Sequence, residues 1–255
     1  MIFFWLAAVL AVGGLSSLLL VPPAAFGRRF HRLIGFMASL LLAAGFAGGA
    51  LKGRAGAALV IASAIWVLVT QWGPLGALRP TLALLVALGW ATLLLGGPEG
   101  PRLPLLTSRT WAVHANGIAA GLYLGSVTLG MLVGHWYLNV PGLDIRYLRR
   151  MTRWLAGCLI LRLLVGLAGI ASSVPTPVTG ALSPWRVVGV AEGFFYWQRL
   201  GIGLVGPAVL TFMIDRTVSL RSTQSATGLL YVAVVLVLIG EMVSRFLYVA
   251  FGIPQ

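Results

Sequence analysis

The chain has 255 residues, of which 59% are hydrophobic and only 9% are charged. A soluble domain of this length carries far more polar surface, so the composition predicts an all-α integral membrane protein that crosses the bilayer several times. The net charge is +13, but the arginines form short clusters between apolar runs, which favours lipid headgroups as partners and excludes nucleic acid.

Eight apolar runs are candidates for membrane-spanning helices, each of which needs about 20 apolar residues. The first begins without a basic segment and has no small-residue cleavage site, so we expect a retained span rather than a signal peptide. The runs lie at 2–21, 33–51, 55–72, 80–96, 110–138, 152–172, 189–214 and 225–250. The sequence thus predicts eight transmembrane helices joined by short connections, in a multi-pass protein of the cell (cytoplasmic) membrane.

Basic residues predict the orientation of these spans. The connections after odd-numbered spans carry the larger arginine clusters, such as "FGRRFHR" at 26–32 and "DIRYLRRMTR" at 144–153. Basic connections stay on the cytoplasmic side of a membrane. With eight spans, both termini are then expected outside the cytoplasm.

A weak internal repeat accompanies this pattern. Segments 26–49 and 145–169 both consist of a basic cluster followed by an apolar run that ends in glycines. If the repeat is real, the chain forms two tandem four-helix bundles, at 1–105 and 106–255. The alternative is coincidence, since any two basic-then-apolar segments look alike.

Ionisable side chains inside the predicted spans fall almost entirely in the second half of the chain. They are His114, His135, Arg162, Glu192, Arg199, Glu241 and Arg245. A charge within hydrocarbon is costly unless it is paired or hydrated, so these residues are either functional or form ion pairs between helices. We therefore expect the first bundle to be a scaffold and the second to hold a polar cluster.

Helical geometry groups several of these residues on common faces. Gly117, Gly121 and Gly125 share one face of the span at 110–138 and predict close helix packing, with approach of a flat ring as the alternative. Glu241 precedes Arg245 by one turn, the favourable order for a helical ion pair. Arg162 needs an acceptor, for which Glu192, Glu241 and a helix carbonyl are candidates.

Metal and haem chemistry is restricted by the few histidines and the single cysteine. Cys158 alone excludes disulfides, cysteine-ligated zinc and iron–sulfur clusters within this chain. A b-type haem needs two histidines on different helices at similar depth. His114 and His135 lie roughly 30 Å apart on one helix, so only His31 and His135 remain as a pair. His31, however, is expected to be a hydrated interfacial residue.

The C-terminal segment 198–254 resembles a known family. An arginine-containing helix with a mid-helix proline is followed by a last helix with a GE…R pattern, here Arg199, Pro207, Gly240, Glu241 and Arg245. This pattern is similar to the C-terminal helices of the polysulfide-reductase and DMSO-reductase membrane-anchor family. The resemblance extends to the eight-span count and the two bundles.

The resemblance implies a membrane-anchor subunit of a respiratory oxidoreductase that exchanges electrons and protons with quinone (menaquinone or ubiquinone), carries no haem of its own and docks to an iron–sulfur subunit. From the one-sided clustering of polar residues we expect proton-carrying roles for His114, Glu192 and Glu241. Contacts to the quinone are expected from Tyr196, Arg199, Arg245 and His135.

Alternatives remain open at this point. His135 is followed by Trp136 and Tyr137, a combination typical of an interfacial aromatic belt. The chain as a whole is alternatively a b-type cytochrome subunit, or a non-catalytic accessory or structural subunit of a membrane electron-transport complex.

Overall fold

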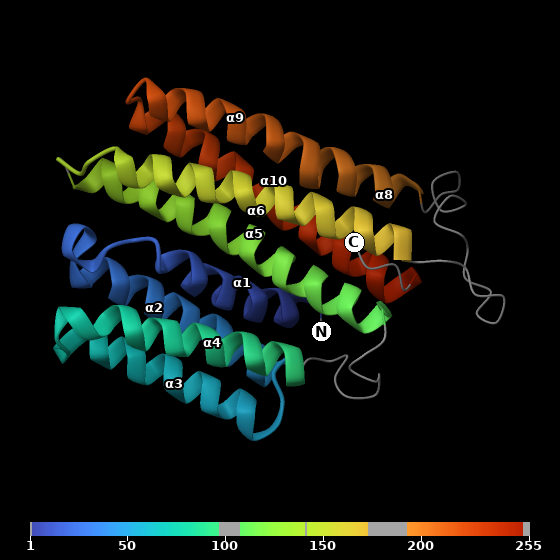
Figure 1. Cartoon of the computed structure of the whole chain (residues 1–255), viewed down its shortest axis with the longest axis horizontal. Helices are drawn as coiled ribbons and strands as arrows, with labels where there is room; N and C mark the ends of the chain where they lie inside the picture. Colours follow the sequence, from blue (N-terminus) through green and yellow to red (C-terminus); the bar gives the residue numbers. More distant parts are fainter. Residues whose placement is uncertain (1, 97–107, 141, 173–192, 252–255) are drawn as a thin grey trace.

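The structure, a computed structural model, describes residues 2–96, 108–140, 142–172 and 193–251, and within them every regular element is a helix (Figure 1). The α-helices are α1 (Ile2–Leu18), α2 (Pro23–Ala47), α3 (Gly53–Trp72), α4 (Leu78–Gly96), α5 (Ser108–Asn139), α6 (Arg146–Ser172), α8 (Gly193–Leu200), α9 (Gly206–Ser219) and α10 (Thr223–Phe251). A 3₁₀-helix, η1 (Leu75–Ala77), precedes α4, and a π-helix, η2 (Gly201–Val205), joins α8 to α9.

Among the described residues, seven helical segments are long and apolar enough to cross a membrane, and α1 is a shorter apolar helix of 17 residues. The prediction of an all-α multi-pass membrane protein is therefore confirmed. The segments α8, η2 and α9 run on as a single span of 27 residues.

Several predicted boundaries differ from the helices by a few residues or more, and at two of them, at the start of the chain, proline explains the difference. The first run was expected to reach residue 21, but α1 ends at Leu18 because Pro22 and Pro23 follow and cannot continue the backbone hydrogen-bond ladder. The second was expected to begin at residue 33, but α2 begins at Pro23, since proline is well suited to the first helical turn. Gly27, with φ of 74°, then bends α2 near its start.

The helices lie side by side in two groups (Figure 1). In the first, α1 packs on α2 and α4, and α3 packs on both of these. In the second, α5 and α9 each pack on α6 and α10. The most extensive contact, between α1 and α5, joins the two groups. The division of the chain into two four-helix bundles at 105/106 stays a prediction.

Helix α5 is the centre of the structure and joins the two groups through α1. Two thirds (67%) of its most apolar 18-residue window is buried, whereas no other span exceeds 39%. A Cβ added to Gly13 or Gly125 would overlap backbone atoms of the facing helix, and one on Gly121 would lie 3.0 Å from the carbonyl oxygen of Val9. The predicted glycine packing is thus confirmed for Gly121 and Gly125, whereas Gly117 faces the ring of Trp5.

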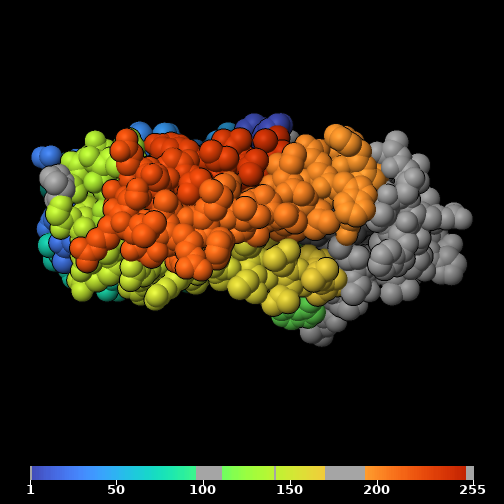
Figure 2. All heavy atoms as spheres, turned by 90° about the horizontal axis from the view of Figure 1, so that it is seen from above, coloured from blue at the N-terminus to red at the C-terminus, as the bar shows by residue number. Residues whose placement is uncertain are grey.

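Large apolar side chains cover much of the outer surface. Figure 2 shows the face formed by α9 and α10, in orange and red. Phe212, Val209 and Val235 are each more than half exposed there. The core is itself largely apolar, and Arg162, Arg199 and Glu241 are buried within it. Apolar side chains on the outer surface are the distribution expected of helices that face lipid.

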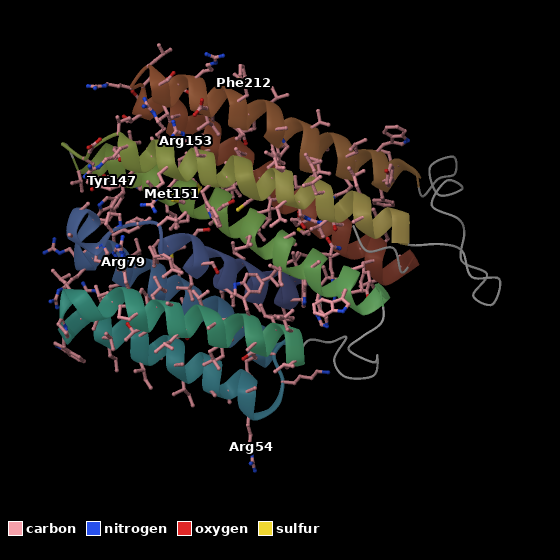
Figure 3. The ribbon with its side chains drawn as sticks, viewed as in Figure 1. Arg54, Arg79, Tyr147, Met151, Arg153 and Phe212 are labelled. Carbon is pink, nitrogen blue, oxygen red and sulfur yellow. The ribbon has the colours of Figure 1, made fainter. Side chains whose placement is uncertain are left out.

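The basic connections gather at one end of the molecule, where the chain turns between α1 and α2, α3 and α4, α5 and α6, and α9 and α10 (Figure 1). Figure 3 shows Arg79 and Arg153 at this end, while Arg54 lies at the start of α3. The last turns of α10 lie toward the opposite end, and the beginning of α1 comes beside α10 where Trp5 contacts Arg245. The predicted grouping of the odd-numbered connections is therefore present.

The α1–α5 contact predicts a large effect of one methyl group. Gly125→Ala should lower the free energy of unfolding by about 1–3 kcal/mol, because the added carbon forces two backbones apart. Gly157→Ala is the control: its Cβ would meet nothing within 4 Å, so stability should be unchanged or slightly raised. Unfolding in mixed detergent micelles, followed by circular dichroism, measures both. Equal effects of the two changes would contradict the close contact.

Candidate functional site

Five side chains from four helices form a buried cluster inside the second group. They are Asn116 of α5, Arg162 of α6, Arg199 of α8, and Glu241 and Ser244 of α10. Arg162, Arg199 and Glu241 are no more than 3% exposed. Ionisable residues buried to this degree in a membrane-spanning bundle must find partners within the protein.

Arg162 is the most connected member of the buried cluster. Its Nε donates to Oε1 of Glu241 at 2.9 Å, and its Nη2 donates to Oε2 at 3.0 Å. The guanidinium and the carboxylate therefore form a bidentate ion pair. Nη2 also donates to Ser244 Oγ at 2.9 Å, and Nη1 donates to Oδ1 of Asn116. Glu241, one of the three acceptors that the sequence left open for Arg162, is thus an acceptor in the structure, whereas Glu192 lies outside the described residues.

Arg199 approaches the same carboxylate from the other side. Its Nη2 donates to Oε1 of Glu241 at 3.0 Å. Within the described part of the chain, its Nε and Nη1 are buried without a hydrogen-bond acceptor. Nη1 lies against Gly203 and Gly240, where a Cβ on Gly203 would come within 2.5 Å of it. Two glycines therefore make room for this guanidinium where the π-helix crosses α10.

The π-helix that follows Arg199 has a local cause. Pro207 lacks the N–H that would reach the carbonyl of Gly203 one α-turn earlier, so that carbonyl loses its usual donor. The hydroxyl of Tyr123, a fully buried residue of α5, donates to this oxygen at 3.2 Å. The glycine motif "GIGLVG" at 201–206 thus serves helix packing and backbone irregularity, and its likeness to a dinucleotide-binding spacing is accidental.

A small pocket borders the buried cluster between α1, α4, α5 and α10; we call it the His114 pocket. Its volume is about 60 Å³, and Arg162 and Glu241 contribute to its wall. The guanidinium of Arg245 also lines it and lies 4.3 Å from the ring centroid of Trp5 and 5.0 Å from that of Tyr248. The pocket therefore combines aromatic walls with arginine, histidine and hydroxyl side chains.

A second cavity, of about 90 Å³, lies between α6 and the α8–η2 segment; we call it the Arg199 cavity. Arg162, Arg199 and Tyr196 supply its polar groups, and the remainder of its wall is apolar. Arg162 borders both spaces, so the buried cluster separates the His114 pocket from the Arg199 cavity.

The structure divides the predicted site residues into three sets. His114, Glu241 and Arg245 meet at the His114 pocket, and Tyr196 and Arg199 line the Arg199 cavity. Glu192 lies outside the described residues. His135 is exposed near the basic end, with its Nδ1 3.2 Å from the hydroxyl of Tyr231. It is thus remote from the cluster, as its aromatic neighbours suggested.

Sequence reasoning missed Asn116, Ser244 and Tyr123. Asn116 and Ser244 are uncharged residues in apolar spans, and their only signal is closeness in sequence to a predicted ionisable residue: Asn116 follows His114 by two residues and Ser244 directly precedes Arg245. For Tyr123 the signal was Pro207, which leaves a carbonyl in need of a donor. The sequence does not reveal which neighbouring helix supplies that donor.

His31 differs from its expectation as a hydrated interfacial residue. It is only 1% exposed, with Nδ1 3.1 Å from the carbonyl oxygen of Gly27 and Nε2 3.2 Å from that of Val21. A histidine whose two ring nitrogens both face backbone carbonyls must turn away from one of them to ligate haem iron. This geometry disfavours the His31–His135 haem pair. Within the described residues, no three His, Cys, Asp or Glu side chains group together in a manner that would hold a metal ion.

Comparisons with models of protein families, with curated proteins and with solved structures find no match for this chain. The resemblance of segment 198–254 to the membrane-anchor family therefore rests on the sequence pattern alone.

The buried cluster predicts a large loss of stability when its carboxylate is neutralised. Glu241→Gln removes the carboxylate that both buried guanidiniums share, which should lower the free energy of unfolding by about 3–5 kcal/mol. Asp144→Asn is the matched control: Asp144 pairs with Arg146 at 3.1 Å, but both side chains are more than half exposed, so less than about 1 kcal/mol should be lost. Detergent unfolding curves test both, and a Glu241→Gln effect as small as the control would refute the buried ion pair.

Proposed function

We propose that the protein is a membrane-anchor subunit of a respiratory oxidoreductase and that the His114 pocket is where it exchanges electrons and protons with quinone. The observation that carries this proposal is the meeting of His114, Arg245 and Tyr248 beside a buried carboxylate in a membrane-spanning bundle. A quinone has two carbonyl oxygens that need hydrogen-bond donors, and its reduction needs a group that delivers protons.

The geometry favours distinct roles for the residues of the pocket. His114 is half-buried and is the proposed proton carrier. Arg245 and Tyr248 are the proposed donors to quinone oxygens. Both oxygens of Glu241 accept bonds from guanidinium groups, so its proposed role is to fix Arg162 in the pocket wall.

The size of the pocket adds a condition. Its volume of about 60 Å³ is below the roughly 150 Å³ of a cavity that holds benzene, so a quinone ring enters only if a wall residue moves. Trp90 is anchored by a 3.0 Å hydrogen bond from its Nε1 to Ser16 Oγ. Trp5 lies in the second turn of α1 and is held by its contact with Arg245. Trp5 is therefore the proposed gate.

The partner chemistry follows from the cysteine count. A single cysteine, Cys158, cannot hold an iron–sulfur cluster, so electrons must pass to or from another subunit. We propose an iron–sulfur subunit as that partner, with lipids around the apolar faces.

A structural or accessory subunit is the second candidate, favoured by a specific observation. The buried cluster ties α5, α6, α8 and α10 together by hydrogen bonds, which a purely structural ion-pair network also does. Quinone binding separates these two functions.

The finer topology belongs to the proposal as well. We propose that α1 also spans the membrane, giving eight spans with both termini outside the cytoplasm. A phosphatase that is active only outside the cytoplasm should be active when fused after Gln255 and inactive when inserted after Gly142, between α5 and α6. The reverse pattern would invert the topology, and activity at both places would refute the odd number of passes, three, between Gly142 and the C-terminus.

Quinone binding should depend on the proposed residues. The purified protein should bind decylubiquinone or menadione, and His114→Gln or Glu241→Gln should weaken binding about tenfold, since each removes a hydrogen bond or the group that positions one. From its predicted role as a proton carrier alone, Glu192→Gln is expected to do the same. His135→Gln, at the other end of α5, is the control and should bind as the unchanged protein does. Quenching of tryptophan fluorescence is a suitable measurement, because Trp5 and Trp90 line the pocket.

Because Glu241→Gln also disturbs folding, His114→Gln is the decisive variant. Binding that is unchanged in all three variants would overturn the site. Absence of any quinone binding by the unchanged protein would favour the structural subunit.

A further inference from the structure

The basic end of the molecule carries far more positive than negative charge. Segments 19–32, 73–79, 142–153 and 215–222 meet there (Figure 1), and together they hold ten arginines and two aspartates. One of these aspartates, Asp144, is already paired with an arginine of its own segment. Basic clusters at a membrane surface attract anionic lipids. This attraction is diffuse, however, unless a groove holds particular arginines beside an apolar surface.

Such a groove lies at the start of α2; we call it the arginine groove. Its volume is about 460 Å³, and its described lining residues are Arg29, Arg32, Leu33, Phe36, Val67 and Trp136. Successive helical residues turn by about 100°, so Arg29, Leu33 and Phe36 share one face of α2. Leu33 is 46% exposed and Phe36 is 54% exposed. The groove therefore changes from cationic to apolar with distance from the basic end.

The two arginines of the groove are held in different ways. Arg32 donates from Nη1 to Oε1 of Gln71, and Arg28 donates to the backbone carbonyl of Gln71 at 3.2 Å, so both tie α2 to the end of α3. Arg29 is exposed and makes no such hydrogen bond within the described part of the chain. A guanidinium binds phosphate oxygens through two parallel N–H groups. Arg29 and the remaining donors of Arg32 therefore suit one phosphate group.

Trp136 of α5 forms the opposite wall of the arginine groove. Its ring lies 5.1 Å from that of Phe30, which holds the tryptophan against α2. Tryptophan is typical of the level at which lipid headgroups meet hydrocarbon. The arginine groove thus combines phosphate ligands with an aromatic side chain suited to that level.

A second groove begins one helical turn deeper along the same two helices; we call it the apolar groove. Its volume is about 350 Å³, and it lies between α1, α2 and α5. Met37 and Leu132 line it, one turn beyond Leu33 on α2 and one turn before Trp136 on α5. Its polar side chain among the described residues, that of Thr128, already donates to the carbonyl of Leu124 at 2.8 Å. The wall thus suits a hydrocarbon chain and not water.

We propose that the two grooves together bind one anionic phospholipid, with its phosphate at Arg29 and Arg32 and one acyl chain in the apolar groove. Phosphatidylcholine adds a cationic group next to its phosphate, which the arginines repel. Because the walls belong to α1, α2 and α5, the lipid also joins the two groups of helices. Trp136 lies about 33 Å along α5 from His114, so this site stands or falls independently of quinone binding.

Native mass spectrometry of the purified full chain in detergent tests the proposal. Dipalmitoylphosphatidylglycerol should bind as one molecule per chain, at least tenfold more tightly than dipalmitoylphosphatidylcholine, which has the same acyl chains and no net charge. Bound lipid should also raise the melting temperature, with saturation. Dihexanoylphosphatidylglycerol and glycerol 1-phosphate keep the headgroup phosphate but shorten or lack the chains. They should bind at least tenfold more weakly than the dipalmitoyl lipid, because they bury less apolar surface.

Arginine variants test the headgroup contact. Arg29→Gln should weaken phosphatidylglycerol binding about fivefold, as expected for one arginine beside an anionic headgroup, and Arg29→Gln/Arg32→Gln should weaken it further. Arg150→Gln/Arg153→Gln is the matched control, since it removes the same charge from exposed arginines at the same end and should leave binding unchanged. If the first double variant does not fold, Arg29→Gln decides, because Arg29 makes no hydrogen bond to α3 among the described residues.

Glycine variants test the acyl chain. Gly14 lines the apolar groove, and a Cβ there would meet nothing within 4 Å, so Gly14→Leu fills the groove without displacing backbone. It should weaken binding of the dipalmitoyl lipid about tenfold and leave binding of the dihexanoyl lipid unchanged. Gly157→Leu is the control: its Cβ also meets nothing within 4 Å, but it lies on α6, away from both grooves, and should change neither.

Several outcomes would overturn the proposal. Equal binding of the two dipalmitoyl lipids would leave only unspecific lipid around the protein. Equal losses in the two double arginine variants would assign the preference to the charge of the whole basic end. Unaltered binding in Gly14→Leu would place the acyl chain elsewhere. Glycerol 1-phosphate that binds as tightly as the lipid would make the ligand a soluble phosphate, and a dimer that retains no lipid would assign the grooves to a second copy of the chain.

Discussion

The ion pair between Arg162 and Glu241 is the interaction on which the second half of the structure depends. Both side chains are almost completely buried, and neither can be solvated where it lies. Their two hydrogen bonds therefore fix the depth and rotation of α6 relative to α10. Apolar packing would fix them less narrowly, because a helix that contacts its neighbour only through leucine side chains can shift along it at little energetic cost. Arg199, Asn116 and Ser244 then add α8 and α5 to the same centre.

The irregular backbone of the span formed by α8, η2 and α9 follows from the same constraint. A membrane interior supplies no water to a carbonyl that has lost its donor, so Pro207 would leave Gly203 unsatisfied without help from another helix. Tyr123 gives that help. The resulting π-helix begins directly after Arg199. The glycine and proline residues of this segment thus give the backbone the irregular shape that surrounds Arg199. A regular α-helix would not have this shape.

Hydropathy alone was enough to predict the helices, since the length and apolarity of a span reflect the membrane and not the neighbouring helices. The contacts of the site were harder to predict. Glu241 was one of three acceptors considered for Arg162, and its i,i+4 spacing to Arg245 pointed toward a partner on its own helix. The choice between partners depends on how far each helix is rotated and how deep it lies, and these quantities are set jointly by several helices. Asn116 and Tyr123 were missed for this reason, whereas the glycine face of α5 was predictable because a regular spacing on one helix encodes it.

The first group of helices is more than a scaffold. Trp5 and Val9 of α1 and Trp90 of α4 form one wall of the His114 pocket, while the charged residues come from α5, α6 and α10. The pocket therefore exists only where the two groups meet. The two groups meet at the contact between α1 and α5, where glycines allow a close approach. Gly13 lies against α5 with no room for a side chain. Because Trp5 stands two turns before Gly13 on the same helix, any shift of α1 along α5 moves the aromatic wall against Arg245. The close glycine contact between α1 and α5 thus positions Trp5 in the wall of the His114 pocket. In this way a helix of the first group shapes a pocket whose charged residues come from the second.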